Sequence, residues 1–549
     1  MLSGNDALAR ALAASRLRVC HGFVGVPLHR LVDGLTSRRT QGITYVPSQS
    51  DLFAASLALG GALLSGGGSA LFLRAGGVNF ALEALATLGL MNELRSPAVI
   101  IAGFDPGPTI AATAQDDRGT FAHTCHLAQL DPGSPDEAYH MTRLAAQASR
   151  LAGMPVVVRV SGRVLDSSAE VQESLADPLS PSGNPWPATF ARSAGPYVMS
   201  SATYRYHVDK RARRLQQLEH LVAACSTQVG LEGDVAVVLA GHLGSRVQSK
   251  VAARKLPSLR LGATWPLPRR LLEQFLRDRR EVVVLEEGER FLERELQGLV
   301  QSLGLQCRVR GVEGQRPIRL DDERLEVVLR RLGEAVTEVR LEERELAGWR
   351  EAQDALVALG PVDMEPWPFF LGRARKKLWG FGAEDPRAQL LAQIRGLERP
   401  SLVVADPSAA AMLGFRDRLI DVKAGFGQAP SVAGALSTAD GVEERAGAPL
   451  AVALLGDLNV YQSSLLGIID NVAHRRDVLH VILVSDLAAP AGGAPGTTIE
   501  GLLRGLEMPY LTARLGEPEV AGALAAMAAE SGPRALVCLG AGREEAIGG

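Results

Sequence analysis

Two apolar runs in the last third of the chain each end beside a residue that carries a side-chain oxygen. Residues 451–455 are followed by Gly456 and Asp457, and residues 481–484 are followed by Ser485. Short apolar runs separated by a helical stretch predict buried parallel strands, whose carboxyl ends share one edge of a sheet. Mg²⁺ prefers oxygen ligands and keeps phosphate oxygens in its coordination shell. A carboxylate and a hydroxyl that meet at this edge could therefore hold Mg²⁺ together with a phosphate group.

Three residues would supply the protein share of the metal ligands. They are the carboxylate of Asp457, the hydroxyl of Ser485 and the backbone carbonyl of Leu487. Each has a simpler interpretation, because an aspartate often closes a strand and a serine is common in a loop. The sequence fits both interpretations of these residues.

The diphosphate contacts are expected on both sides of the metal ligands. Gly456, Leu458 and Asn459 flank Asp457, and Gly492-Gly493 forms a turn after the second run. A glycine pair in such a place lets the backbone approach a phosphate closely, but it also forms plain tight turns. Asn459 would orient the diphosphate.

The composition excludes several classes of protein. The chain has 549 residues, 46% hydrophobic and 22% charged, with a formal net charge of −3. This length predicts three or four domains, and the charge offers no field for nucleic acid. The basic clusters at residues 210–214 and 277–280 are interpreted as solvated helix faces. No apolar run is long enough for a membrane span, and the amino terminus makes a poor signal peptide.

The five cysteines are scattered and form no C-x-x-C pair. This pattern favours a reducing cytoplasm and predicts neither a disulfide framework nor an iron–sulfur cluster in this chain.

Apolar runs alternate with amphipathic helical stretches along most of the chain, which predicts an α/β fold with mainly parallel sheets. Strands are expected at residues 69–73, 98–102, 156–160, 234–239, 281–285, 451–455, 481–484 and 535–539. Helices are expected at residues 50–64, 80–90, 136–152 and 209–227. Residues 313–375 are charged and helical and are interpreted as a linker.

Several short strings, taken in order, resemble one known family. In the first part of the chain they are Ser3-Gly4-Asn5-Asp6-Ala7-Leu8-Ala9-Arg10, Gly22-Phe23-Val24-Gly25-Val26-Pro27, Gly76-Gly77-Val78-Asn79, Asp105-Pro106-Gly107 and Gln115-Asp116-Asp117-Arg118. Further along they are Gly262-Ala263-Thr264-Trp265-Pro266-Leu267-Pro268 and Val283-Val284-Leu285-Glu286-Glu287. The chain resembles the alpha subunit of indolepyruvate ferredoxin oxidoreductase, one of the thiamine diphosphate-dependent 2-oxoacid:ferredoxin oxidoreductases.

The resemblance implies a three-domain thiamine diphosphate-binding fold. It implies a pyrimidine-binding-like domain at 1–165, a connector at 166–230 and a transketolase-C-like domain at 231–312. A helical linker at 313–380 and a diphosphate-binding domain at 381–549 would follow. In such proteins the active site lies between the first and last domains, commonly of two protomers, so a homodimer or heterodimer is expected.

The resemblance also implies a catalytic acid beside the aminopyrimidine ring of thiamine. Aligning Gly60 with the family's helix glycine puts Asp51 in that place, where the family has Glu. A slip of one residue toward Gly61 would put Leu52 there and abolish the function. The alternative is that Asp51 caps the helix that begins near Ser50.

A cation should meet the carboxylate of a 2-oxoacid substrate, and Arg118 and His123 lie in the segment where the family places one. Either could instead be an ordinary surface or loop residue. Val26 stands where relatives carry a threonine near the substrate, so one hydrogen bond is missing.

Three functions remain open from the sequence. The first is a thiamine diphosphate- and Mg²⁺-dependent enzyme that decarboxylates an aryl or branched 2-oxoacid. Its electrons would leave through a second, beta- or gamma-like subunit, because the family's cysteine-rich ferredoxin-like domain has no counterpart in this chain. The second is non-redox decarboxylation or carboligation. The third is a catalytically silent structural or regulatory subunit.

Overall fold

The computed structural model describes residues 1–37, 42–65, 68–91, 94, 96–105, 116–173, 189–190, 204–230, 233–311, 330, 343–344, 385–406, 419–437, 449–484 and 498–540. The chain divides into two compact units. The first comprises Met1–Pro47, Gly68–Asn184 and Val208–Val362. The second comprises Ser48–Gly67, Pro185–His207 and Asp363–Gly549.

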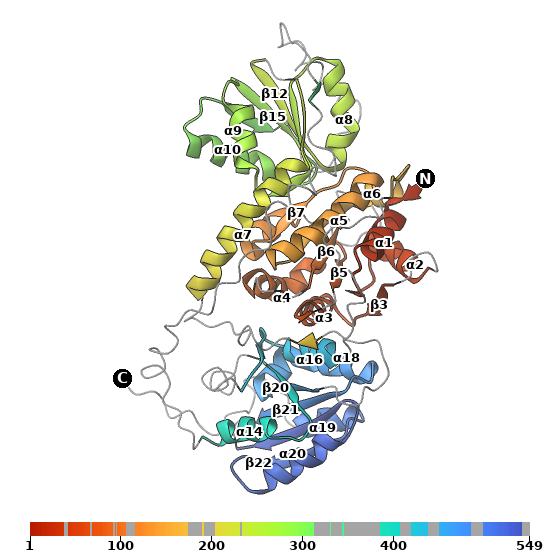
Figure 1. Ribbon diagram of the computed structural model, residues 1–549, viewed down its shortest axis with the longest axis vertical. Coiled ribbons are helices and arrows are strands. Elements are labelled where there is room, and N and C mark those ends of the chain that lie inside the picture. Colours follow the sequence, from red (N-terminus) through yellow and green to blue (C-terminus); the bar gives the residue numbers. More distant parts are fainter. Residues whose placement is uncertain are drawn as a thin grey trace. The chain divides into compact units, whose positions relative to one another are not determined.

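A seven-stranded sheet forms one half of the first unit (Figure 1). Its order is β14 (Ala263–Trp265), β7 (Ala128–Leu130), β8 (Val156–Ser161), β6 (Ala98–Phe104), β5 (Ser69–Leu73), β2 (Val19–Gly22) and β3 (Thr44–Pro47). All neighbours are parallel except β14 and β7. Strands β5, β6 and β8 are buried on both faces, which explains their unbroken apolar sequences. The helices of this half include α1 (Gly4–Ala14), α4 (Gly77–Met91) and α5 (Pro135–Ala152).

A second, six-stranded sheet completes the first unit. Its order is β16 (Arg308–Gly311), β15 (Glu281–Leu285), β12 (Val235–Ala240), β13 (Ser258–Leu261), β11 (Thr227–Val229) and β17 (Glu343–Arg344). The two faces of this sheet carry separate hydrophobic cores. One core includes residues of α9 (Arg269–Leu276) and α10 (Phe291–Leu303), and the other includes residues of α8 (Gly241–Ala253).

The second unit contains a parallel sheet of six strands (Figure 1). The order is β19 (Val422–Lys423), β18 (Ser401–Ala405), β20 (Leu450–Gly456), β21 (Val478–Val484), β23 (Arg534–Leu539) and β22 (Tyr510–Arg514). Helices α14 (Pro386–Arg395) and α20 (Glu519–Ala529) share one core with one face of this sheet. Helix α16 (Ala429–Ser437) packs against β18 and β20.

Helix α3 (Asp51–Ala62) belongs to the second unit and packs tightly on α16. A Cβ added to Gly60 would lie 2.6 Å from Cβ of Ala435 and 2.9 Å from the carbonyl oxygen of Val432. Such distances exclude any larger residue unless the helices move apart. At Gly60 the two helices therefore approach so closely that a glycine is required.

The expected elements are confirmed, with ends that shift by a few residues. The strand expected at 69–73 is β5, and those expected at 451–455 and 535–539 lie within β20 and β23. The solvated-face interpretation of the basic clusters is wrong for four residues, because Lys210, Arg211, Arg214 and Arg279 are buried. Arg214 donates to the carbonyl of Gly153, and Arg279 donates to the carbonyl of Phe275. Most of the linker expected at 313–375 lies outside the described residues.

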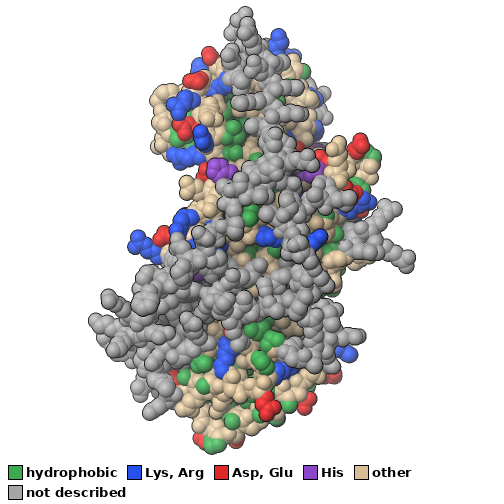
Figure 2. All heavy atoms as spheres, in the orientation of Figure 1, with side chains coloured by type: hydrophobic (Ala, Val, Ile, Leu, Met, Phe, Trp, Pro, Cys, Tyr) green, Lys and Arg blue, Asp and Glu red, His purple; other side chains and the backbone are tan. Residues whose placement is uncertain are grey.

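No helix within the described ranges is long and apolar enough to span a membrane. Lys and Arg side chains are interspersed with Asp and Glu over the described surface that Figure 2 shows. This mixture agrees with a formal net charge of −3 and offers no broad area of one sign on that face.

A buried histidine lies in the centre of the second unit's sheet. Asn471 Nδ2 donates to the Pro430 carbonyl at 2.9 Å and to His480 Nε2 at 3.1 Å. Arg476 donates to Asn471 Oδ1 at 3.2 Å, which fixes the orientation of the amide. His480 Nδ1 therefore carries the proton and donates to the carbonyl of Arg534 at 3.1 Å. Burial lowers the pKa of His480 to about 4.

We expect His480 to make the stability of this unit fall in weak acid. Its pKa is about 4 when folded, against an ordinary value of 6.5. Between these two values the unfolded chain binds a proton that the folded chain rejects, so the free energy of unfolding falls by about 3 kcal/mol across this window. Urea unfolding of His480→Gln at pH 7 and pH 4.5 should show a flatter dependence on pH. His220→Gln, at an exposed position, should keep the wild-type slope.

Candidate functional site

Two aspartates follow neighbouring strands at the carboxyl edge of the second unit's sheet. Strand β18 ends at Ala405 and is followed by Asp406, and β20 ends at Gly456 and is followed by Asp457. The strands are parallel, with Ala405 opposite Leu454, so both acids leave the sheet at the same edge. Ligands of open α/β sheets bind outside the carboxyl ends of the strands.

Asp406 organises the backbone around this edge. It is fully buried, and its Oδ1 accepts a hydrogen bond from the amide of Ala429 at 2.8 Å. Its Oδ2 accepts from the amide of Gly427 at 3.2 Å and from the hydroxyl of Ser464 at 2.7 Å. The carboxylate thus ties the start of α16 to η4 (Val460–Ser464), the π-helical turn that follows Asp457.

Asp457 is the first residue of the short helix α17 (Asp457–Asn459) and is 4% exposed. Its Oδ1 accepts a hydrogen bond from the amide of Leu458 at 2.8 Å, which holds the carboxylate at the helix start. Asn459 is also buried, whereas the Leu458 side chain is 58% exposed. The strand end thus carries one buried carboxylate, one buried amide and one apolar side chain in solvent.

Gly456 precedes Asp457 and has no close described neighbour at its α-carbon. Its φ of −90° suits any residue, and a Cβ there would meet no described atom within 4 Å. Neither the backbone conformation nor the described neighbours therefore require glycine at this position.

Buried polar atoms around η4 and α16 lack partners among the described residues. They are Gln428 Oε1 and Nε2, Ser431 Oγ and Ser463 Oγ. A Cβ on Gly427 would lie 2.0 Å from Ser463 Oγ, so this cluster is tightly packed around the loop that Asp406 holds. A buried carboxylate with polar groups buried nearby fits an oxygen-rich ligand such as a diphosphate with its cation.

Four predicted residues at this edge lie outside the described residues: Ser485, Leu487, Gly492 and Gly493. Within the described ranges, no group of three or more His, Cys, Asp or Glu side chains could hold a metal ion. The predicted metal site does not have that composition, since it uses one carboxylate, one hydroxyl and one carbonyl.

Asp406 and Gln428 are not among the site residues predicted from the sequence. The signal for Asp406 was the same as for Asp457, because residues 402–405 are an apolar run that ends at an aspartate. Gln428 offered no signal, since only packing reveals that its amide is buried.

Asp51 begins helix α3 but does not cap it. The cap is Ser50, whose hydroxyl accepts a hydrogen bond from the amide of Phe53 at 3.4 Å. Asp51 is the next residue, in the first turn, and is only 2% exposed. The amino end of a helix favours negative charge, which suits a buried carboxylate at this position.

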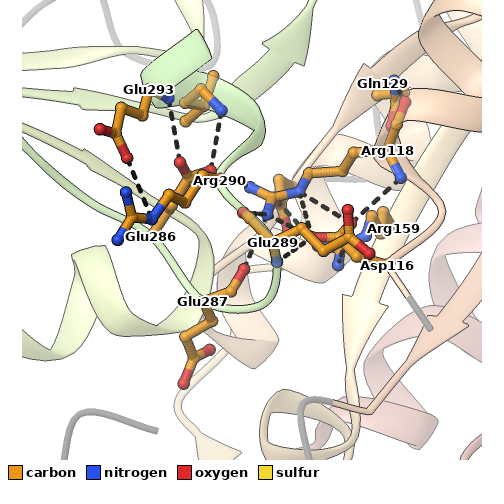
Figure 3. A network of polar contacts seen from close by, with 11 residues as sticks. Asp116, Arg118, Gln129, Arg159, Glu286, Glu287, Glu289, Arg290 and Glu293 are labelled. Atoms are coloured by element: carbon orange, nitrogen blue, oxygen red, sulfur yellow. Dashed lines mark hydrogen bonds and ion pairs between the residues drawn. The ribbon is translucent and has the colours of Figure 1, made fainter. Parts of the chain in front are cut away.

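Arg118 lies in a buried network that joins the two sheets of the first unit (Figure 3). Its Nε donates to Asp116 at 3.0 Å, and its Nη1 donates to Glu286 at 2.7 Å. Its Nη2 donates to the carbonyls of Glu287 and Glu289, both at 2.8 Å. Every nitrogen of the guanidinium already donates to a group of this chain, and the side chain is 1% exposed.

The network holds more carboxylates than arginines at its centre. Arg159 donates to Asp116 at 3.2 Å and to Asp131 at 3.3 Å. Burial would raise the pKa of Asp116, but Arg159 and Arg118 hold it well below its usual range. Burial raises the pKa of Asp131 despite both arginines, and it raises the pKa of Glu286 despite Arg118.

His123 lies at the surface of the first unit, with about half of its side chain exposed. Its Nε2 is 3.0 Å from a carboxylate oxygen of Glu295, and its ring meets Trp265 edge-on at 5.3 Å between centroids. These contacts pack His123 against α10 and against Trp265 of β14. Arg118 and His123 therefore both contact the region that contains α10.

The described geometry can be compared with known proteins. No protein-family profile matches the chain. It is 24% identical over 523 residues to the indolepyruvate oxidoreductase subunit IorA of Methanothermobacter marburgensis, covering 93% of this chain and 79% of that protein. It is 26% identical over 330 residues to the IorA subunit of Methanothermobacter thermautotrophicus, covering 58% of this chain and 51% of that protein.

A solved structure shows the fold. It is a putative thiamin diphosphate-dependent enzyme from Mycobacterium smegmatis, with a TM-score of 0.50 and 15% identity, covering 99% of this chain and 100% of that one. Over nearly its whole length the chain thus resembles the IorA subunits of indolepyruvate oxidoreductase, on the α/β fold of a thiamine diphosphate-dependent enzyme.

Proposed function

We propose that this chain binds thiamine diphosphate with Mg²⁺ and acts on a 2-oxoacid, which it decarboxylates while a separate partner subunit takes the electrons. The observation that carries the proposal is the buried Asp457 at the carboxyl end of β20. The relatives that resemble the chain are named as subunits of indolepyruvate oxidoreductase, which supports a 2-oxoacid and a partner subunit.

The proposal assigns roles to residues of the second unit. Asp457 would hold Mg²⁺ with Ser485 and the carbonyl of Leu487. Gly456, Leu458 and Asn459, together with Gly492 and Gly493, would contact the diphosphate. When bound, thiamine diphosphate supplies a nucleophilic carbon and an electron sink for decarboxylation.

The acid in this proposal is Asp51. A carboxyl group there would share its proton with a ring nitrogen of the aminopyrimidine and so assist proton transfer by the cofactor. Its burial at the start of α3 supports the role. The contacts of Arg118 give no support to a role in binding the substrate carboxylate, because its donors are engaged by Asp116, Glu286 and backbone carbonyls.

We expect Asp457→Ala to abolish cofactor binding. Calorimetry of the purified chain with thiamine diphosphate and Mg²⁺ should show saturable binding, and the variant should bind at least about 100-fold more weakly, because the ligand bond to the metal and its charge are both lost. Asp477→Ala is a matched control, since Asp477 pairs with Arg399 and Arg534 away from the strand end. Absence of binding by the wild type would contradict the proposal.

A catalytically silent subunit is the second candidate, and one observation favours it. Leu458 is 58% exposed at the place where the family carries a glycine, so an apolar side chain stands beside the predicted metal ligand. The two candidates differ in the result with Leu458→Gly. A silent subunit would gain cofactor affinity only in this variant, whereas an active enzyme binds the cofactor without it.

Non-redox decarboxylation is separated from the redox reaction by the acceptor. Release of CO₂ from phenylpyruvate by the chain alone would favour the non-redox reaction. Release that depends on an added electron acceptor would favour the redox one.

A further inference from the structure

Two exposed aromatic side chains flank Arg74 at the carboxyl edge of the seven-stranded sheet. Phe23 follows β2, Arg74 follows β5, and Phe80 lies near the start of α4. The guanidinium carbon of Arg74 is 5.5 Å from the centroid of the Phe23 ring and 5.6 Å from that of Phe80. The cation therefore lies within contact distance of both rings.

Two exposed phenylalanine rings around one arginine form an apolar patch on the surface of the first unit. Phe23 is 37% exposed, Phe80 is 66% exposed, and the neighbouring Val24 is also exposed. Exposed apolar groups gathered around a polar centre mark binding sites more often than scattered ones do. Here the polar centre is a single arginine.

The backbone around Arg74 is fixed. Strands β2 and β5 are parallel neighbours, and the amide of Ala75 donates to the carbonyl of Val26 at 3.1 Å. A Cβ added to Gly25 would lie 2.4 Å from Cδ of Arg74, so the glycine lets the loop lie directly against the arginine stem. Arg74 Nη1 also donates to the carbonyl of Ala75 at 3.4 Å.

The chemistry of this arrangement selects a particular ligand. A guanidinium binds a carboxylate through two parallel hydrogen bonds, and aromatic rings stack on an aryl group. The carboxyl ends of parallel strands are also where α/β sheets bind their ligands. A small molecule with one carboxylate and one aryl group matches both features.

We propose that Arg74, Phe23 and Phe80 form the subsite that recognises an aryl 2-oxoacid. Arg74 binds the carboxylate, and the two phenylalanine rings line the aryl group. This inference rests on the proposed function and deepens it, because it assigns the substrate contacts to residues other than Arg118 and His123. It also makes Arg74 a specificity-determining residue in the first unit.

Three ligands and two variants separate the carboxylate contact from the aryl contact. Calorimetry on the full chain would use phenylpyruvate, pyruvate, which lacks the ring, and phenylacetaldehyde, which lacks the carboxylate. Arg74→Gln should weaken phenylpyruvate and pyruvate by about 10- to 100-fold and leave phenylacetaldehyde unchanged. Phe80→Ala should weaken phenylpyruvate and phenylacetaldehyde by about tenfold and leave pyruvate unchanged.

Matched variants keep this test interpretable. Arg277→Gln removes an exposed arginine of α9's carboxyl end, and Leu511→Ala removes an exposed apolar side chain of β22. Neither should change any of the three affinities. Arg74→Lys keeps the positive charge but loses the planar guanidinium, so it should retain part of the phenylpyruvate affinity. Thermal unfolding of each variant checks that it folds.

Several results would overturn the subsite. Equal weakening of all three ligands by Arg74→Gln would assign the arginine a structural role. If Arg74→Gln weakened the binding of thiamine diphosphate and left the 2-oxoacid affinities unchanged, the three residues would belong to the cofactor site instead. Absence of phenylpyruvate binding by a wild type that does bind thiamine diphosphate would overturn the subsite and leave the proposed function standing. Failure of the wild type to bind thiamine diphosphate overturns the proposed function, and it is measured without any 2-oxoacid.

Discussion

Asp51→Asn should lower the turnover of a 2-oxoacid by about 10²- to 10⁴-fold, the range that a positioned general acid or base contributes. The substitution keeps the size of the side chain and its place at the start of α3, where only 2% of Asp51 is exposed. It removes the carboxyl group that would share its proton with the aminopyrimidine ring. Steady-state turnover of phenylpyruvate with an added electron acceptor measures the effect.

Two further variants sharpen this prediction. Asp51→Glu restores the longer side chain that the family carries, so it should retain or increase turnover if reach is the limiting feature. Asp33→Asn changes another aspartate in the first turn of a helix, α2 (Leu31–Thr36), but at an exposed position, and should have no effect. Thiamine diphosphate affinity should change little in Asp51→Asn, and turnover within about twofold of the wild type would rule out the assigned role.

Arg118→Met should destabilise the first unit by about 3–5 kcal/mol, because it leaves buried carboxylates without their cation. Asp116 and Glu286 both pair with Arg118, and all three side chains are buried. Glu286 also accepts the amides of Leu292 and Glu293 at 2.9 and 3.0 Å, so the change reaches the start of α10. We expect the unfolding temperature of this unit to fall by about 10 °C in calorimetry.

An exposed pair gives the contrast. Arg277 pairs with Glu273 in solvent, and Arg277→Met should cost at most about 1 kcal/mol. Adding Glu286→Gln to Arg118→Met should recover part of the loss, because one of the stranded charges is then removed. A fall for Arg118→Met no larger than that for Arg277→Met would show that the network contributes little to stability.

Local sequence patterns predicted the strands and helices well, because buried parallel strands have nearly continuous apolar sequences. Residues 451–455 and 281–285 are examples, and both became strands buried on two faces. The same patterns could not distinguish a solvated basic helix face from a buried one. Arg214 is buried because it reaches the carbonyl of Gly153, a contact between residues far apart in the sequence.

The candidate site was predicted unevenly for the same physical reason. Asp457 follows an apolar run, so its place at a strand end could be read locally, and the structure puts it there. Arg118 was assigned to a substrate carboxylate because its segment resembles the family's. Its actual partner Glu286 lies 168 positions further along the chain, and no local sequence pattern can predict such a pairing.

Strand β14 has a consequence for how the protein can be divided. It follows the second sheet's strand β13 in the sequence, yet it pairs antiparallel with β7 at the edge of the seven-stranded sheet. A fragment that ends before Ala263 would leave the backbone of β7 as an open edge, which is a template for pairing with other chains. Such a fragment should aggregate, whereas one that extends through α10 keeps that edge covered. The seven-stranded sheet is thus completed by β14, a strand that would be lost if the chain were cut directly after the other six strands of that sheet.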